Sequence, residues 1–216
     1  MRRPRDEARR ARNDVYRQHI FEAAERVFAE RGFESAKLQD ISKLVGLSMG
    51  TIYAIFPSKA DLYRAILEER GAELGTLARG VVARKAPARE TLDALIEVYI
   101  DYFVAHPGFL RMHLRSGASW ALSPLAGTDV RLQHSQDVHE LQADIFRRGI
   151  AEGVFVDEDP GYLARLFSVM DQVLLADWVA GGMKATQDDL VARLKRQVAR
   201  SFYRPSTGRS REARAS

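Results

Sequence analysis

Residues 48–59 read SMGTIYAIFPSK, a short run of small and polar residues between two strongly apolar segments. Ser48 is a typical helix N-cap, and Ile52 and Phe56 lie four residues apart on one side of a helix that Pro57 ends. The positions that face sideways or outward are small apart from one tyrosine: Gly50, Thr51, Tyr53 and Ala54. A helix with so small an outer face suits close contact with a surface outside the chain.

Apolar residues recur at helical spacing on both sides of this segment. The pattern predicts a longer helix over about residues 15–31, capped by Gly32, and a second short helix that ends at Gly46. Ser58 and Asp61 form an S-x-x-D capping box that opens a fourth helix. Two short helices joined by a tight glycine turn, with a longer helix before and after them, are typical of a helix-turn-helix module.

A helix-turn-helix places its second short helix in the DNA major groove, where bulky side chains would hold the backbone away from base edges. The small outer face of residues 48–56 fits that requirement. Donors at neighbouring helix ends are expected to reach phosphates: Lys37, Tyr53, Ser58 and Lys59.

Residues 17–67 resemble the DNA-binding domain of TetR/AcrR-type bacterial transcriptional regulators, and the most specific part is GLSMGTIYxxFPSKxxL, which starts at Gly46. The resemblance covers about a quarter of the chain. It implies a homodimer that binds a palindromic operator. It also implies a larger C-terminal domain that holds a small-molecule pocket and the dimer interface, with ligand binding that weakens DNA binding.

By position, Tyr53 and Lys59 match phosphate contacts of that family, and Gln39 matches a position that can reach a base edge. Lys37 and Ile55 depart from the family, which often has threonine at the first position and histidine or tyrosine at the second. We therefore expect modest base discrimination, helped by operator shape and by an arginine arm in an adjacent groove. The expected DNA contacts are Lys37, Gln39, Ser48, Met49, Gly50, Thr51, Tyr53, Ser58 and Lys59.

Positive charge concentrates at the two ends of the chain. Residues 1–60 carry 12 Lys and Arg against 8 Asp and Glu, residues 61–199 have a net charge of −4, and residues 200–216 carry 5 basic residues against 1 acidic. The arginine-rich residues 1–12 are expected to form a disordered basic arm suited to DNA phosphates. Residues 204–216 are expected to be a disordered, solubilising basic tail.

Composition and motifs exclude several classes of protein. Hydrophobic residues make up 46% and charged residues 29%, as in soluble globular proteins. Cysteine is absent, so disulfides and thiolate ligands are excluded. No apolar run approaches the ~18 to 20 residues of a membrane span, so we expect a cytoplasmic protein. The five histidines lack metal-site spacing, and phosphate-loop, dinucleotide and serine-nucleophile motifs are missing. No catalytic residue, metal or cofactor is expected, and an enzyme is the weaker alternative.

The rest of the chain keeps helical periodicity with almost no strand alternation, so we expect an all-α protein. A helix-turn-helix domain over residues 13–67 would precede a helical regulatory and dimerisation domain over residues 68–203. Residues 161–179 are apolar nearly all round and need cover on both sides. With residues 188–202 they would form a four-helix dimer interface. The expected interface residues are Leu166, Met170, Val173, Leu174, Leu190, Leu194 and Val198.

A ligand pocket is expected among apolar side chains of the larger domain, with ordinary core packing as the alternative for each. Asp171 and Asp177, on an otherwise apolar helix, must be paired, protonated or at a wet seam. They would either bind a cationic or hydroxylated ligand or form hydrogen bonds at the dimer seam. Trp120 is the best single candidate for a pocket wall. The expected pocket residues are Phe103, Met112, Trp120, Phe146, Met170 and Trp178.

These patterns predict a dimeric, ligand-responsive transcriptional regulator, expected to be a repressor. Its partners would be double-stranded DNA, a second copy of the chain and an unknown small molecule, with no membrane. We expect ligand to shift the fourth helix and so the distance between the two recognition helices. The alternative is a ligand-independent architectural or partner-tethered DNA-binding factor, and a cavity in the larger domain would argue against it.

Overall fold

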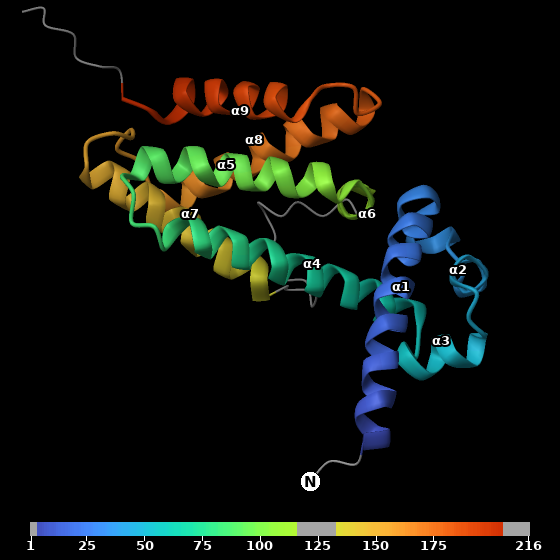
Figure 1. Ribbon diagram of the computed structural model, residues 1–216. Helices are drawn as coiled ribbons and strands as arrows, with labels where there is room; N and C mark the ends of the chain where they lie inside the picture. Colours follow the sequence, from blue (N-terminus) through green and yellow to red (C-terminus); the bar gives the residue numbers. More distant parts are fainter. Residues whose placement is uncertain (1–3, 116–132, 205–216) are drawn as a thin grey trace, which may run out of the picture. The chain divides into compact units, whose positions relative to one another are not determined.

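The computed structural model describes the backbone of residues 4–115 and 133–204 and the side chains of residues 15–115 and 137–204 (Figure 1). Within these ranges the regular structure is helical, which confirms the expected all-α class, and Phe155 and Tyr203 form an isolated β-bridge. None of the described helices is long and apolar enough to cross a membrane. The helices are α1 (Pro4–Ser35), α2 (Leu38–Val45), α3 (Met49–Ile55), α4 (Lys59–Val82), α5 (Ala88–Ala105), α6 (Pro107–Arg115), α7 (Gln133–Ala151), α8 (Pro160–Ala180) and α9 (Gln187–Phe202).

The chain divides into two compact units. Unit 1 comprises Met1–Leu77 and Asp101–Gln136, and unit 2 comprises Ala78–Ile100 and Asp137–Ser216. This division differs from the expected boundary after residue 67 for two reasons. Helix α4 runs unbroken past that point, and α6 packs against α1 and so belongs to unit 1.

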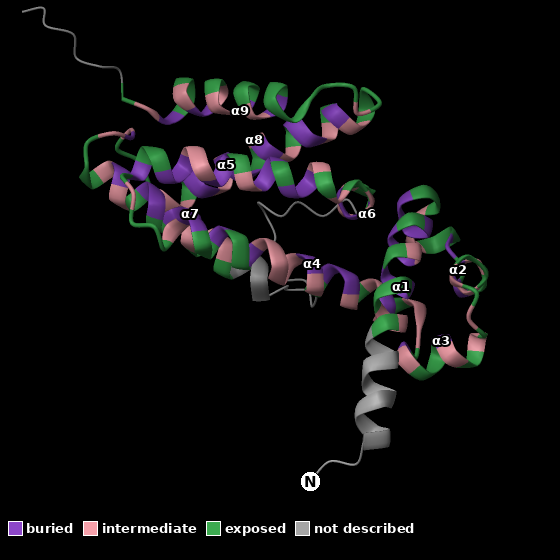
Figure 2. Ribbon diagram, viewed as in Figure 1, coloured by how far each residue is buried: buried purple, intermediate pink, exposed green. Residues whose placement is uncertain are grey.

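Unit 1 is built around α1, against which α2, α3 and α6 pack. The sides of α1 and α2 that face each other carry buried residues (Figure 2). Gly32, with φ 75° and ψ 168°, ends the regular part of α1, as expected for a glycine cap. The core residues shared by these helices are Ile20, Phe21, Ala24, Val27, Phe28, Ala36, Leu38, Ile41, Ile52, Phe56, Leu62, Ile66 and Met112.

The N-terminal segment differs from its expectation. Helix α1 begins at Pro4, so residues 4–12 of the expected disordered arm are helical. Proline suits the first helical position, and the alanine, glutamate and arginine residues that follow it are good helix formers. The rest of the expected arm, residues 1–3, and residues 205–216 of the expected tail lie outside the described residues.

Unit 2 contains most of α5 together with α7, α8 and α9, and α8 lies beside α9 (Figure 1). Phe146 packs among Phe155, Phe167 and Phe202, with ring centroids 5.2–6.4 Å from its own. A Cβ at Gly149 would lie 2.1 Å from the Phe155 ring, so glycine is required where that ring crosses α7. An aromatic cluster therefore joins α7, α8 and the end of α9.

Candidate nucleic-acid interface

A tight turn joins α2 to α3 in a conformation that favours glycine. Gly46 caps α2 with φ 68° and ψ 24°, in the left-handed region. Ser42 Oγ donates to the Leu47 carbonyl over 2.6 Å, which fixes the turn. Ser48 then caps α3, accepting a hydrogen bond from the Thr51 N–H at 3.2 Å. Both expected caps are present, and they fix the direction in which α3 leaves the turn.

As expected, one face of α3 is buried and the other is exposed. Ile52 is fully buried, and the C-cap Phe56 is 3% exposed. Met49 and Thr51 lie at the boundary and are half-buried. Tyr53 is 49% exposed and extends from the outer face. That face is otherwise small, and its residues are Gly50, Tyr53 and Ala54.

The start of α2 adds two exposed polar side chains. Lys37 occupies the N-cap position with an extended backbone, and its side chain makes no capping hydrogen bond. Gln39, two residues later, is also exposed. Leu44 is 54% exposed, because α2 is two turns long and its buried residues are Leu38 and Ile41.

Ser58 is used in a local cap. Its Oγ donates to Asp61 Oδ2 over 2.7 Å and accepts from the Asp61 N–H at 3.1 Å. The bond from the Asp61 N–H is one half of the expected S-x-x-D box, while the Asp61 carboxylate accepts from the Ser58 hydroxyl. Because the hydroxyl already forms hydrogen bonds with Asp61 at the start of α4, Ser58 is less suited to a phosphate contact.

Lys59 has a structural role that the sequence pattern did not predict. Its Nζ donates to the carbonyls of Phe33, Glu34 and Ala36 at 2.6, 3.1 and 3.1 Å, and it lies 4.5 Å from the centre of the Phe33 ring. An ammonium group has three protons, and carbonyls in the last turn of a helix and just after it, like these three, lack partners within the helix. In the structure this side chain therefore links α4 to α1.

A buried ionic cluster lies behind this surface in unit 1. Arg70 Nε of α4 is 2.6 Å from Glu25 Oε1 of α1, and its Nη1 is 3.0 Å from Glu73 Oε2. Tyr102 of α5 donates to the same Glu73 oxygen over 2.7 Å. Burial alone would raise the pKa of Glu73, but the hydrogen bonds from Tyr102 and Arg70 outweigh it and the pKa is lowered. Glu25, a charged residue on the apolar side of α1, was the signal available in the sequence.

Arg17 was also not identified from the sequence. Its guanidinium lies 4.7 Å from the centre of the Phe21 ring and 5.1 Å from that of Phe56, and it pairs with Glu69 at 3.5 Å. Phe56 is the C-cap of α3, so this half-exposed cation lies next to the end of the recognition helix. The spacing of an arginine four residues before a phenylalanine was the available signal.

Two of the expected pocket residues belong to the core of unit 1. Phe103 is 4% exposed and its ring stacks on Phe109, with 6.0 Å between centroids. Met112 is 1% exposed and packs in the core of the helix-turn-helix. For both residues the core-packing alternative holds.

The other expected pocket residues do not form one wall either. Phe146 is fully buried in the aromatic cluster of unit 2, and Trp178 is 8% exposed with its Nε1 donating to a backbone carbonyl 3.1 Å away. Met170 is half-buried and lines a surface groove of unit 2. Trp120 lies outside the described residues.

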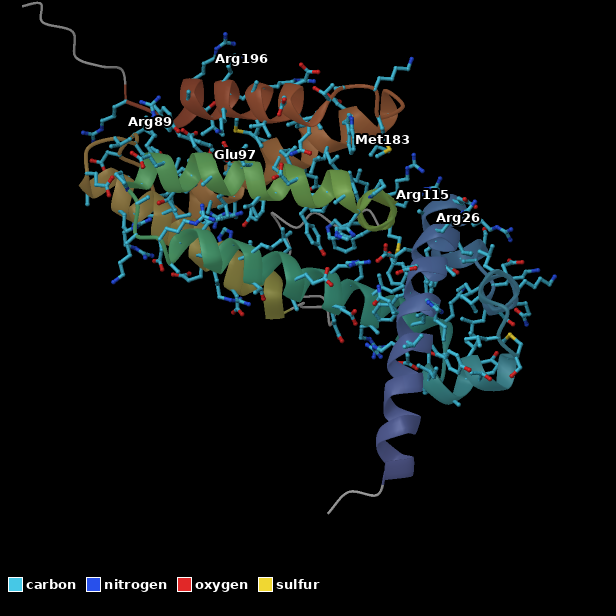
Figure 3. The ribbon with its side chains drawn as sticks, viewed as in Figure 1. Arg26, Arg89, Glu97, Arg115, Met183 and Arg196 are labelled. Carbon is cyan, nitrogen blue, oxygen red and sulfur yellow. The ribbon has the colours of Figure 1, made fainter. Side chains whose placement is uncertain are left out.

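Four of the seven residues expected at a dimer interface are buried within the chain. They fill the contact between α8 and α9, because the apolar stripe of α9 faces α8 and leaves no second apolar side for a partner. These residues are Leu174, Leu190, Leu194 and Val198. Helix α9 is also held to α5, with Lys195 Nζ 2.5 Å from Glu97 Oε1, while the exposed Arg196 projects outward (Figure 3).

Helix α8 keeps an exposed apolar stripe. Tyr162, Val169 and Val173 are 45%, 37% and 55% exposed, and Leu166 and Met170 between them are half-buried. The stripe borders a groove of about 380 Å³ between α8 and α9. The groove is lined by Val169, Met170, Val173, Leu174, Arg193, Gln197, Arg200 and Ser201.

Known proteins share both the sequence pattern and the fold. Residues 20–66 match the family described as bacterial regulatory proteins, tetR family. The chain is 28% identical over 145 residues to the HTH-type transcriptional repressor NicS of Pseudomonas putida, covering 67% of this chain and 68% of NicS. It is 31% identical over 93 residues to the HTH-type transcriptional activator FasR of Mycolicibacterium smegmatis, covering 43% and 42%. A putative transcriptional regulator from Saccharomonospora viridis in complex with choline has a TM-score of 0.72 at 24% identity, covering 89% of this chain and 100% of that one.

A capped recognition helix with a small exposed face, held in an all-α chain, defines a helix-turn-helix DNA-binding protein. Residues 20–66 form a DNA-binding domain of the tetR family of bacterial regulatory proteins, and the chain as a whole is similar to transcriptional regulators of that type.

Proposed function

We propose that the protein is a homodimeric repressor of transcription that acts in the cytoplasm. It binds an inverted-repeat operator in double-stranded DNA through unit 1, and it releases the operator when a small molecule binds unit 2. The protein carries out no catalysis in this role.

The outer face of α3 carries this proposal. Gly50 and Ala54 allow the helix backbone to approach base edges, and Tyr53, half exposed beside them, can donate to a phosphate. Lys37 and Gln39 at the start of α2 extend the same set of polar groups with a charge and an amide. Met49 and Thr51 lie at the edge of the face, where each can touch a base or the sugar. Ser48, Ser58 and Lys59 hold the helices in place, so their role is indirect.

The exposed stripe on α8 supports the dimer. Tyr162, Val169 and Val173 together present an apolar surface that a second copy of the same helix would cover. The half-buried Leu166 and Met170 would complete it. Because two helix-turn-helix modules then face one duplex, the operator should contain two half-sites about one helical turn apart.

Helix α4 is the element through which ligand binding would act on DNA binding. It begins at Lys59, which holds the end of α1, and it carries Arg70, which holds Glu25 in the middle of α1. A shift of α4 would therefore move α1 and the recognition helix with it. Such a shift changes the separation of the two recognition helices, to which half-site binding is sensitive.

Selection of bound duplexes from a random DNA library, at one stated salt concentration, tests the proposal. Enrichment of an inverted repeat, together with a dimer mass by light scattering, is the expected result. Salt-sensitive binding with no enriched motif would contradict it and would favour an architectural DNA-binding factor.

A further inference from the structure

The buried face of α8 contains one carboxyl group, and one of its two oxygens has no hydrogen-bond partner among the described residues. Asp171 is 3% exposed, and its Oδ1 accepts no hydrogen bond. Asp177, two turns later, is exposed and pairs with Arg193 at 3.2 Å. The two aspartates that the sequence singled out therefore have different environments, and only Asp171 lies in the interior of unit 2.

A chain of buried hydrogen bonds links side chains of three helices in unit 2. Ser168 Oγ donates to Gln142 Oε1 over 2.9 Å, and Gln142 Nε2 donates to Tyr99 OH over 3.3 Å. All three side chains are at least 94% buried, and Tyr99 is close enough for the charge of Asp171 to raise its pKa. Gln142 retains a second amide proton and Tyr99 its hydroxyl proton, so the two hydrogen bonds of this chain leave two donor protons unused.

Within the part of the chain whose side chains are described, no ion pair is found at Asp171, and no cation is among the causes that shift its pKa. Helix α5 contributes Tyr99, α7 contributes Gln142, and the buried residues of α9 are apolar. Burial is the cause that raises the pKa of Asp171, to about 7. A carboxylate in such a site is costly unless a cation accompanies it.

We propose that Asp171, Tyr99 and Gln142 form the recognition centre of the ligand site in unit 2 and that the ligand is a small organic cation, an alkylammonium. This inference rests on the proposed ligand-responsive function and names its ligand class. The ammonium group pairs with the Asp171 carboxylate, and the Tyr99 ring, which stacks near Phe167 with 6.3 Å between centroids, offers an aromatic face to the alkyl part. A neutral ligand leaves the carboxylate unpaired, and an anion is repelled by it.

Three probes of equal chain length test the charge preference: n-hexylammonium, n-hexanol and hexanoate. Calorimetric titration into the full-length protein at pH 8 should show hexylammonium binding at least about tenfold more tightly than hexanol, with no binding of hexanoate. Because only the ionised carboxyl pairs with the cation, affinity should fall as pH is lowered below about 7, approaching tenfold per pH unit.

Asp171→Asn keeps the shape of the side chain and removes its charge, and it should abolish the preference for hexylammonium. The matched control is Asp177→Asn, which removes an exposed charge from the same helix and should leave the preference unchanged. The comparison of the three probes on the unaltered protein does not depend on the variant folding.

Equal binding of hexylammonium and hexanol, preference for hexanoate, or no binding of hexylammonium would each contradict the ligand class. Retention of the preference in Asp171→Asn would contradict the site. Operator binding is measured on the same preparations. Intact operator binding with a failed ligand result rejects this inference alone, whereas absence of a selected operator rejects the proposed function.

Discussion

Arg70 of α4 donates from Nε to Oε1 of Glu25 on α1 over 2.6 Å, and each side chain is 10% exposed. The pair connects the middle of the first helix of the DNA-binding unit to the helix that leads out of it. A buried ion pair of this kind contributes little net stability, but removal of one member leaves the other charge unpaired in the interior.

Glu25→Gln should therefore lower the free energy of unfolding by about 3 kcal/mol, measured by urea denaturation. The matched control is Glu30→Gln, which breaks the exposed pair of Arg26 and Glu30 on the same helix and should cost less than about 0.5 kcal/mol. In the double variant Glu25→Gln/Arg70→Met the two losses should not add, because the second change removes the stranded charge. Equal effects of Glu25→Gln and Glu30→Gln would contradict a buried role for the pair.

Lys59→Met should destabilise the protein by about 1–3 kcal/mol, since three carbonyls at the end of α1 lose a charged donor. Lys37→Met should leave stability unchanged, because that side chain is exposed and makes no capping bond. On a selected operator, Lys37→Met should reduce the slope of log affinity against log salt by about 2, the loss of one phosphate contact from each protomer of the proposed dimer. A loss of stability in Lys37→Met, together with unchanged stability in Lys59→Met, would contradict these roles.

Gly149→Ala should destabilise unit 2, because the added methyl would lie 2.1 Å from the Phe155 ring and would force the aromatic cluster apart. A loss of about 1–3 kcal/mol is expected, seen as a fall in the melting temperature. Gly80→Ala is the control. Its Cβ meets no atom within 4 Å and its position in α4 is helical, so it should be neutral or slightly stabilising.

Asp171→Asn should change how stability depends on pH. The folded-state pKa of about 7 lies above the ordinary value of 3.8, so the folded protein binds the proton more tightly and loses stability as pH rises between these values. The amide of the variant does not ionise, so the variant does not lose this stability as pH rises. It should match the wild type near pH 4 and be more stable at pH 8, by at most about 4 kcal/mol. A pH-independent difference in unfolding free energy between the two proteins would contradict the burial of an ionisable carboxyl.

Local signals in the sequence located the helix-turn-helix well, because caps and turns are determined by neighbouring residues. Gly46, Ser48 and Ser58 each have the predicted local role, and Ile52 and Phe56 are buried as their spacing indicated. The sequence did not predict which distant residues the polar side chains contact. Nothing within a few residues of Lys59 indicates that its ammonium meets carbonyls at residues 33–36, which lie more than 20 positions earlier.

Unit 2 shows the same limit. Helical periodicity predicted the positions of α8 and α9 to within a residue or two. An apolar stripe in the sequence, however, does not indicate whether the same chain or a partner subunit buries it. Leu194 and Val198 were assigned to a dimer and are instead buried against α8, while Val173 is exposed as a dimer contact requires. Asp171 could be identified from the sequence because a carboxylate on an apolar helix must be neutralised or paired, although its state required the structure.

The central claim is that the small outer face of α3 enters the DNA groove, and operator binding by Gly50→Leu tests it most directly. A Cβ at Gly50 meets only Ser48 Oγ, at 3.8 Å, so the free protein should fold as before, with an unchanged or higher melting temperature. Gly80→Leu, at another exposed helical glycine, is the control for an added side chain. We predict that Gly50→Leu weakens binding to the selected operator by roughly 100-fold, about 3 kcal/mol, while Gly80→Leu binds like the wild type. Wild-type affinity in a folded Gly50→Leu protein would contradict the account.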